Sequence, residues 1–141
     1  MRVLGVDVGQ RRIGLAISDR SRTLARPLTT LTIKSVHDGV DRVARAITEL
    51  RAEDDGLDMV VVGLPLKLDG SASVATARTV EFIDALRMRV PVVILTEDER
   101  LTSHEAESRL AVRERDWRKR KEKLDAAAAA IILQDYLDRS A

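Results

Sequence analysis

The sequence contains no cysteine and only two histidines, His37 and His104, among its 141 residues. Disulfide bonds and thiolate metal sites are therefore excluded, and a metal ion would be held mainly by carboxylates. Such oxygen ligands suit Mg²⁺ or Mn²⁺ better than Zn²⁺. We expect His37 to lie at the surface. His104 follows a run of acidic residues, but a helix-surface position is the more common role for such a histidine, so we leave it out of the catalytic set.

The chain also lacks an excess of charge of either sign, since 24 basic residues face 23 acidic ones and the net charge is +1. This balance excludes a uniformly basic coat for nucleic acid, although it permits a local basic patch. No apolar run is long enough to cross a membrane, and Met1 and Arg2 lead directly into an apolar strand instead of a signal peptide. We therefore expect a cytoplasmic protein without a membrane partner, folded as a single domain over residues 1–141.

The stretch RVLGVDVGQRRIGLAISD organises the rest of the chain. Its two apolar runs, Val3–Val8 and Ile13–Ile17, are joined by a polar link and predict a β-hairpin. Strand alternation places Asp7 on one face together with two glycines, which weaken a strand but allow a ligand to approach the backbone closely. An ionised carboxylate is costly to bury unless it is paired or holds a metal. Asp7 is thus either a site residue or an edge-strand aspartate that faces water.

Alternating and helical patterns after the hairpin predict the remaining elements. Pro27 moves the third strand to the edge of the sheet or into a bulge, because proline has no N–H to donate. The order of a three-strand meander followed by strand–helix units predicts an α/β fold. Its five-stranded mixed sheet has three antiparallel strands first, then parallel crossovers, with helices on its faces. The further strands are predicted at Leu24–Ile33, Leu57–Val62 and Pro91–Thr96. Three of the helices are predicted at Val36–Glu53, His104–Leu110 and Leu124–Leu137. Another helix, between the last two strands, is capped by Ser71 or Ser73 and has Ala77, Val80, Ile83 and Leu86 along one side.

Acidic residues from three distant segments are expected at the carboxyl end of this sheet, where ligand sites of open α/β sheets cluster. Asp7 lies near the end of the first strand, Asp98 and Glu99 come just beyond the last strand, and Asp125 heads the apolar face of the last helix. By itself, Asp125 is better explained by the helix dipole, which favours acids in a first turn. Three carboxylates at one edge, however, repel one another unless divalent cations neutralise them. Two metals about 4 Å apart are a known arrangement for phosphodiester hydrolysis.

Four segments, GVDVGQRRIGLAISD, VVGLPLKLDGS, DERLTS and LDAAAAAIILQDYL, resemble the conserved blocks of the YqgF (RuvX-like) family in order and spacing. The resemblance implies a ribonuclease H-like fold. It also implies a nuclease that trims the 5′ end of the precursor of 16S ribosomal RNA, with Mg²⁺ or Mn²⁺ as cofactor. It further implies that Asp7, Glu99 and Asp125 are the catalytic acids and metal ligands. Asp98 can share the role of Glu99, because sequence does not decide which neighbour faces the metals.

One position departs from the Holliday junction resolvases of the same superfamily. Those enzymes carry a further acid one helical turn beyond the last-helix carboxylate, and Ala128 stands there in this chain. The nearest acid on the other side, Glu122, lies a turn earlier. We therefore expect weaker binding of a second metal and less resolvase activity.

Basic side chains near these acids are the candidate contacts to nucleic acid. The segment RERDWRKRKEK, residues 113–123, holds seven basic and three acidic residues around the only tryptophan. Such residues bind phosphates and can stack on an unpaired base, although a charged run is more often a solvated helix face. For the arginines of the hairpin tip, ordinary surface charge is the stronger interpretation. The candidates are Arg11, Arg12, Lys67, Ser71, Arg100, Arg113, Trp117, Arg118, Lys119, Arg120, Lys121 and Lys123.

We predict a metal-dependent nuclease acting on structured RNA, with branched DNA as the alternative substrate. Two alternatives belong to other classes of protein. Asp-x-Gly hairpins also bind ATP phosphates in actin-like ATPases, although those proteins close two such domains over the nucleotide. A ribosome-assembly protein that binds RNA without cleaving it is the other. A monomer and a homodimer both fit the sequence.

Overall fold

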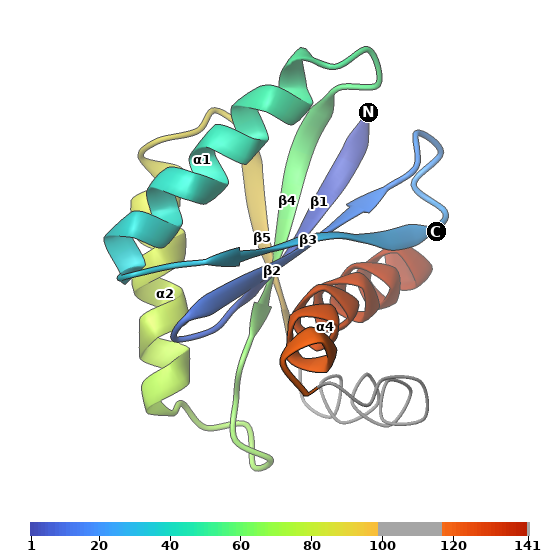
Figure 1. The fold of residues 1–141 in the computed structure, drawn as a ribbon. Helices are drawn as coiled ribbons and strands as arrows, with labels where there is room; N and C mark the ends of the chain where they lie inside the picture. The colour runs from blue at the N-terminus through green and yellow to red at the C-terminus, as the bar shows by residue number, and fades with distance from the viewer. Residues whose placement is uncertain (99–116, 141) are drawn as a thin grey trace.

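The computed structural model describes residues 1–98 and 117–140, with side chains of the last helix from Asp125 onward. Its core is a five-stranded sheet in the order β3-β2-β1-β4-β5. Strands β1 and β2 pair antiparallel, as do β2 and β3, whereas β4 runs parallel to β1 and to β5 (Figure 1). The predicted α/β class and mixed sheet are confirmed. The strands are β1 (Arg2–Val8), β2 (Arg12–Ser18), β3 (Ala25–Thr32), β4 (Leu57–Leu64) and β5 (Val93–Asp98).

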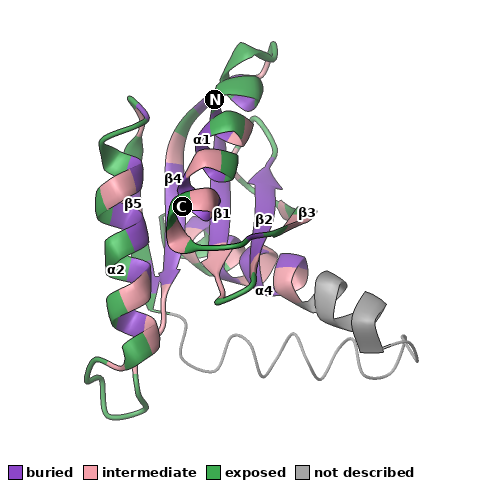
Figure 2. Cartoon of the chain, turned by 60° about the vertical axis from the view of Figure 1, so that its left-hand side comes forward, coloured by how far each residue is buried: buried purple, intermediate pink, exposed green. Residues whose placement is uncertain are grey.

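The helices cover both faces of the sheet. Helices α1 (Val36–Ala52) and α2 (Val74–Arg87) lie on one face, and α4 (Trp117–Ser140) lies on the other (Figure 1). Because side chains alternate along a strand, Leu4 and Val6 join the larger core under α1 and α2, whereas Val3 packs with residues of α4. As predicted, Asp7 lies on the same face of its strand as Val3, and the structure shows that this is the face covered by α4. Buried residues follow the central strands (Figure 2).

Strand β3 lies at the edge of the sheet, as Pro27 predicts. The register between β3 and β2 also shifts between Leu15 and Ala16 of β2. Ala16 is the residue that pairs with Pro27. Proline has no N–H for the ladder, and an edge strand with an irregular register tolerates that loss. Helix α1 begins after Ser35, whose hydroxyl accepts a hydrogen bond from the backbone N–H of Asp38 at 3.1 Å, so the predicted cap is confirmed.

Helix α2 begins after Ser73, one of the two predicted caps, but its buried face differs from the prediction. Ala77 and Val80 are exposed, while Thr76 and Thr79 are buried together with Phe82, Ile83 and Leu86. The two threonines can be buried because each hydroxyl finds a backbone carbonyl, that of Pro65 for Thr76 and that of Ala75 for Thr79. A buried polar group costs little when it is hydrogen-bonded.

Two predicted boundaries near the site were wrong. Strand β5 runs two residues beyond Thr96, so Asp98 is its last residue instead of following it. Helix α4 already includes Trp117, because the Lys, Arg and Glu residues that follow are strong helix formers. The predicted helix His104–Leu110 falls outside the described residues. In the described part of the chain, no helix combines the length and the apolar character that crossing a bilayer requires.

Candidate active site

Asp7 and Asp125 meet on the α4 face of the sheet, at the carboxyl end of β1. Asp7 pairs directly with Gly14 of β2, so both residues face the same side. A Cβ atom at Gly14 would overlap with the backbone carbonyl oxygen of Asp125. The backbone of α4 therefore rests on Gly14 at Asp125, next to Asp7. The structure thus places both acids, which the strand and helix patterns bring to one edge of the sheet, on either side of Gly14.

The glycines of the hairpin bring the helix this close to the sheet. A Cβ at Gly5 would lie 2.8 Å from Cβ of Leu133 and 2.9 Å from the carbonyl oxygen of Ala129. The sequence predicts a close approach at Gly5 and Gly9, the glycines that flank Asp7, and assigns it to a ligand. In the structure the group that approaches Gly5 is α4 itself, whose residues Ala128, Ala129 and Ile132 are buried, whereas Gly9 faces the carbonyl oxygen of Arg12 in the hairpin.

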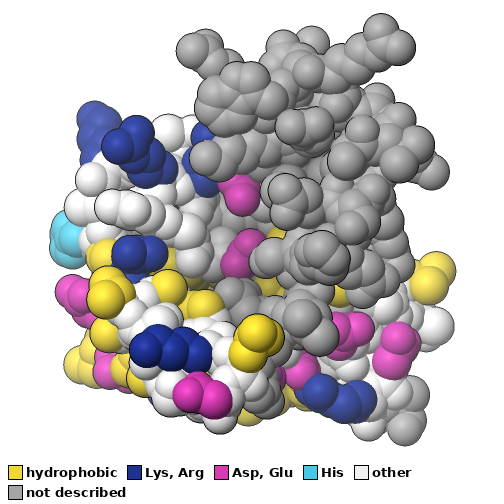
Figure 3. Space-filling model, turned by 90° about the horizontal axis from the view of Figure 1, so that it is seen from below, with side chains coloured by type: hydrophobic (Ala, Val, Ile, Leu, Met, Phe, Trp, Pro, Cys, Tyr) yellow, Lys and Arg dark blue, Asp and Glu magenta, His cyan; other side chains and the backbone are white. Residues whose placement is uncertain are grey.

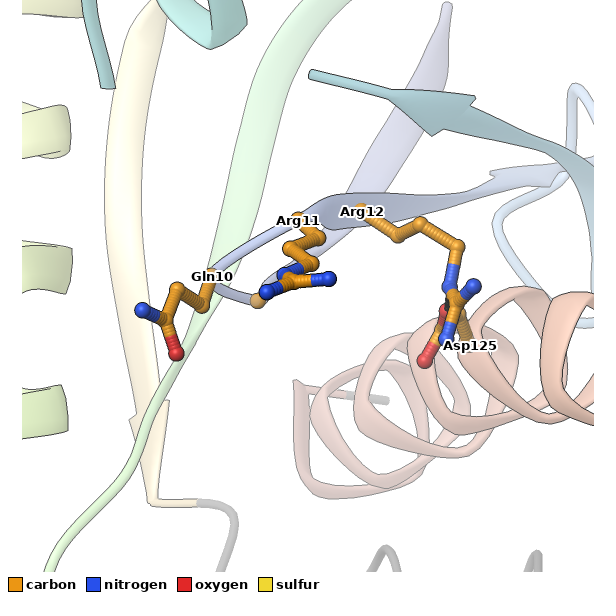
Figure 4. Close-up of a pocket in the computed structure, with 5 residues that line it drawn as sticks. Gln10, Arg11, Arg12 and Asp125 are labelled. Atoms are coloured by element: carbon orange, nitrogen blue, oxygen red, sulfur yellow. Dashed lines mark hydrogen bonds and ion pairs between the residues drawn. The ribbon is translucent and has the colours of Figure 1, made fainter. Parts of the chain in front are cut away.

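Arg12 is the cationic partner of Asp125. Its Nε donates to Oδ2 of Asp125 at 2.9 Å, and each side chain is 25% exposed. Both residues line an open depression of about 300 Å³ together with the hairpin residues Gly9, Gln10 and Arg11. Arg12 reaches from the hairpin down to the helix, whereas Gln10 points away from Asp125 (Figure 4). Arg11 is exposed at the tip. Among the described residues, the depression is thus lined by two guanidinium groups and one carboxylate.

The end of the molecule that carries this depression has both signs of charge. Acidic side chains lie near the middle of the face in Figure 3, and Lys and Arg side chains gather to one side of them. Carboxylates beside cationic groups are suited to an anionic substrate that also needs a divalent cation.

The donor set fits a hard cation, although the described residues supply only part of it. Asp7 and Asp125 offer carboxylate oxygens on one face, the ligands that Mg²⁺ and Mn²⁺ prefer. Among residues 1–98 and the described side chains of α4, no group of three acidic or histidine residues is close enough to hold a metal. The predicted third ligand, Glu99, lies outside the described residues. Asp98 is exposed, and strand alternation places it on the face opposite to that of Glu97.

Glu97 is a residue of this region that the sequence analysis missed. It is only 3% exposed, pairs with Gly63 of β4 in the sheet, and forms an ion pair with Arg139 near the end of α4. The hydrogen bond to Glu97 raises the pKa of Arg139 above its ordinary value. A signal was present, because alternation from the apolar residue Ile94 places Glu97 on the α4 face. The arginine that pairs with it, 42 residues away, had no signal in the sequence.

The loop after β4 holds two more candidates, Lys67 and Ser71. A tight turn closes it, with Gly70 N–H donating to the carbonyl of Lys67 at 2.8 Å and Lys67 N–H donating to that of Ser71 at 2.9 Å. Gly70 has φ +88°, a conformation that favours glycine. The Ser71 hydroxyl donates to Oδ1 of Asp69 at 2.6 Å, whereas Lys67 is exposed. Of the two, Lys67 is therefore the better placed to bind a phosphate.

The other predicted contacts are only partly covered by the structure. Arg100 and Arg113 lie outside the described residues, as does His104. The structure describes the backbone of α4 from Trp117 but no side chain before Asp125, so the roles of Trp117, Arg118, Lys119, Arg120, Lys121 and Lys123 stay predictions. His37 is 85% exposed in its side chain, which confirms the predicted surface position.

Sequence comparisons match almost the entire chain. A family model described as "RuvX: Holliday junction resolvase" matches residues 1–139. A protein of Chloroflexus aggregans named "Putative pre-16S rRNA nuclease" is 43% identical over 136 residues, covering 96% of this chain and 92% of its own length. A protein of Anaeromyxobacter sp. (strain K) with the same name is 40% identical over 141 residues, covering 100% of this chain and 99% of its own length.

Solved structures with the same fold are more distant in sequence. The fowlpox virus Holliday junction resolvase superposes with a TM-score of 0.58 at 14% identity, covering 100% of both chains. RuvC of Thermus thermophilus gives a TM-score of 0.51 at 16% identity, covering 99% of this chain and 96% of its own. These likenesses confirm the predicted ribonuclease H-like architecture.

Proposed function

We propose that this chain, which belongs to the RuvX family, is a nuclease that hydrolyses phosphodiester bonds of structured nucleic acid. One observation carries the proposal. Asp7 of β1 and Asp125 of α4 come together on one face of the sheet, beside an open depression that Arg11 and Arg12 also line. Acids and guanidinium groups in one open site suit a substrate made of phosphates and a reaction assisted by a divalent cation.

We assign Asp7 and Asp125 as ligands of Mg²⁺ or Mn²⁺, with Glu99 or Asp98 as the third acid. When bound, such a cation supplies Lewis-acid stabilisation of the negative charge that develops at the phosphate. The protein holds the two carboxylates in place through β1 and through the seat of α4 on Gly14. Arg11 and Lys67, both exposed near the carboxyl ends of the strands, hold the backbone of the substrate. No residue forms a covalent intermediate in this proposal.

The substrate we propose is the precursor of 16S ribosomal RNA, processed in the cytoplasm at its 5′ end. The names of the relatives with about 40% identity support this choice. Branched DNA is the second candidate, supported by the description of the family model. Ala128 argues against efficient junction cleavage, because this buried alanine stands where the resolvases have a further acid. A monomer suffices for cutting one RNA strand, whereas a junction cutter needs two sites.

The test compares cleavage of labelled 16S rRNA precursor and of a synthetic four-way junction, each in Mn²⁺ and in EDTA. We expect cleavage of the RNA in Mn²⁺ only. In both Asp7→Asn and Asp125→Asn, the rate should fall at least about a hundredfold because a metal ligand is lost. Asp54→Asn, in the exposed turn after α1, is the control with the same change of charge. Its rate should equal that of the wild type.

The other outcomes separate the remaining interpretations. Rapid, symmetric cleavage of the junction without cleavage of RNA would make branched DNA the substrate. RNA binding that survives the loss of both acids, without cleavage of either substrate, would favour a ribosome-assembly protein. Full activity of purified Asp7→Asn would refute the proposed mechanism.

A further inference from the structure

The contact between Arg12 and Asp125 is held from both sides. The N–H of Gly9 donates to the carbonyl of Arg12 at 2.9 Å and closes the hairpin. Two residues further along β2, Gly14 supports the backbone of Asp125. The main chains that carry the two side chains are thus fixed next to each other, and the Nε–Oδ2 hydrogen bond of 2.9 Å forms without reaching into solvent.

This arrangement gives the guanidinium a specific electrostatic role. Two carboxylates that share one site repel each other, and a nearby cation allows both to stay ionised. Arg12 supplies such a cation at Asp125, on the face that Asp7 also occupies. A divalent cation that binds Asp125 would then have to share this carboxylate with a positive charge a few ångströms away.

We propose that Arg12 occupies the place of the divalent cation at Asp125 and moves to a phosphate of the substrate when the cation binds. The inference rests on the proposed function, because it concerns the same site. The depression of about 300 Å³ beside Asp125 gives the guanidinium room to turn, and Gly9, Gln10 and Arg11 line it. Arginine suits both positions, because its planar group binds carboxylates and phosphates in the same geometry. Binding of the cation and of the substrate would therefore favour each other.

A different role for Arg12 predicts the opposite result. If Arg12 only oriented Asp125 for the metal, its removal would weaken metal binding about ten- to hundredfold, as the loss of such supporting groups does. If it competes with the metal, its removal strengthens binding. The sign of the change in affinity therefore decides between the two roles.

The experiment is a Mn²⁺ titration, by calorimetry or by the electron paramagnetic resonance signal of free Mn²⁺, of the full chain without nucleic acid. We expect Arg12→Gln to bind Mn²⁺ about tenfold more tightly than the wild type. Arg12→Lys keeps the charge and should stay within about threefold of the wild type. Arg11→Gln removes the same charge from the same hairpin tip without touching Asp125, so its affinity should change less than about twofold.

A second measurement follows Arg12 to the substrate. Binding of labelled RNA is measured against salt concentration, in Ca²⁺ and in EDTA. The slope of log affinity against log salt concentration reports the number of phosphate contacts. In Ca²⁺, a hard cation with the same oxygen ligands, this slope should be smaller for Arg12→Gln than for the wild type by the equivalent of about one phosphate contact. In EDTA the two slopes should agree, because Arg12 is held by Asp125.

The outcomes distinguish this inference from the function on which it rests. In one outcome, the wild type binds Mn²⁺, Asp125→Asn does not, and Arg12→Gln binds it as tightly as the wild type or more weakly. This result would overturn the role of Arg12 and leave the metal site intact. If Arg12→Gln reduced the salt dependence of RNA binding equally in Ca²⁺ and in EDTA, the proposed movement of Arg12 to the substrate would be refuted. Absence of Mn²⁺ binding by the wild type would overturn both the inference and the metal site.

Discussion

Gly14 is the residue of β2 against which the backbone of Asp125 packs. It follows Arg12 by two residues in β2, faces Asp7 across the hairpin, and supports the carbonyl of Asp125. A side chain at this position meets backbone, which cannot move aside as a flexible side chain can. Gly14 is therefore part of the site, because its lack of a side chain lets the backbone of Asp125 pack next to Asp7.

Gly14→Ala is expected to lower the free energy of unfolding by about 1–3 kcal/mol, the usual cost of overpacking, and to reduce cleavage by displacing Asp125. Urea denaturation and the cleavage assay measure the two effects. Gly39→Ala in α1 is the matched control, since the three atoms nearest to its Cβ would be methyl carbons of the side chains of Ile13 and Ile33. The same stability and rate for Gly14→Ala as for the control would contradict this account of the helix seat.

Among the elements, α1 shows how local chemistry stabilises the fold away from the site. Asp38 follows the cap Ser35, and its Oδ2 accepts a hydrogen bond from the backbone N–H of Lys34 at 2.9 Å. Arg42, one turn later, donates to both of its oxygens at 3.2 Å. The hydrogen bond from Lys34, followed by the contact with Arg42, holds the pKa of Asp38 below its ordinary value.

A lowered pKa means that the ionised form of Asp38 stabilises the folded state. This stabilisation is complete above the ordinary pKa of an aspartate, about 3.9, and is lost as the pH falls through the lower folded-state pKa. Asp38→Asn should therefore have a lower urea midpoint than the wild type at pH 7, and the difference should shrink as the pH falls through the lowered pKa of Asp38. Asp54→Asn is the control. A difference that persists unchanged at low pH would show that the charge of Asp38 is not its cause.

For the molecule as a whole, Glu97 and Arg139 join the far end of α4 to the edge strand β5. Helix α4 is the cover of its face among the described elements, and it also carries Asp125. The ion pair fixes this helix across the sheet, while Gly14 fixes it near its other end. The carboxylate is buried and the guanidinium is mostly exposed, so the loss of the arginine leaves a buried charge behind.

Arg139→Gln should therefore lower the melting temperature by about 4 °C or more, and cleavage should fall because α4 is less firmly placed. Adding Glu97→Gln should restore part of the stability, because the buried charge is removed as well. Arg51→Gln, which removes an arginine from the exposed last turn of α1, is a control for the loss of charge. A double variant less stable than Arg139→Gln alone would contradict this interpretation.

Local patterns predicted most of the architecture. Three correct predictions depend only on residues close together in the sequence. They are the alternation of β1 and β2, the cap at Ser35 and the apolar face of the helix behind Asp125. Such signals are present in the sequence itself. The buried face of α2 was wrong because the threonines are satisfied by backbone carbonyls, one of them from Pro65 outside the helix. The pattern of apolar residues alone does not contain that information.

The sequence by itself determined the strand order of the hairpin, the mixed sheet, and the arrival of Asp7 and Asp125 at one end of the molecule. It did so because the periodicity of side chains fixes which face each residue occupies. Only the tertiary structure decided that Arg12 pairs with Asp125, that Glu97 is buried against Arg139, and that Gly14 is the seat of α4. These contacts join residues 42 to 113 positions apart. Their partners are chosen by the packing of the helix on the sheet, which no local pattern encodes.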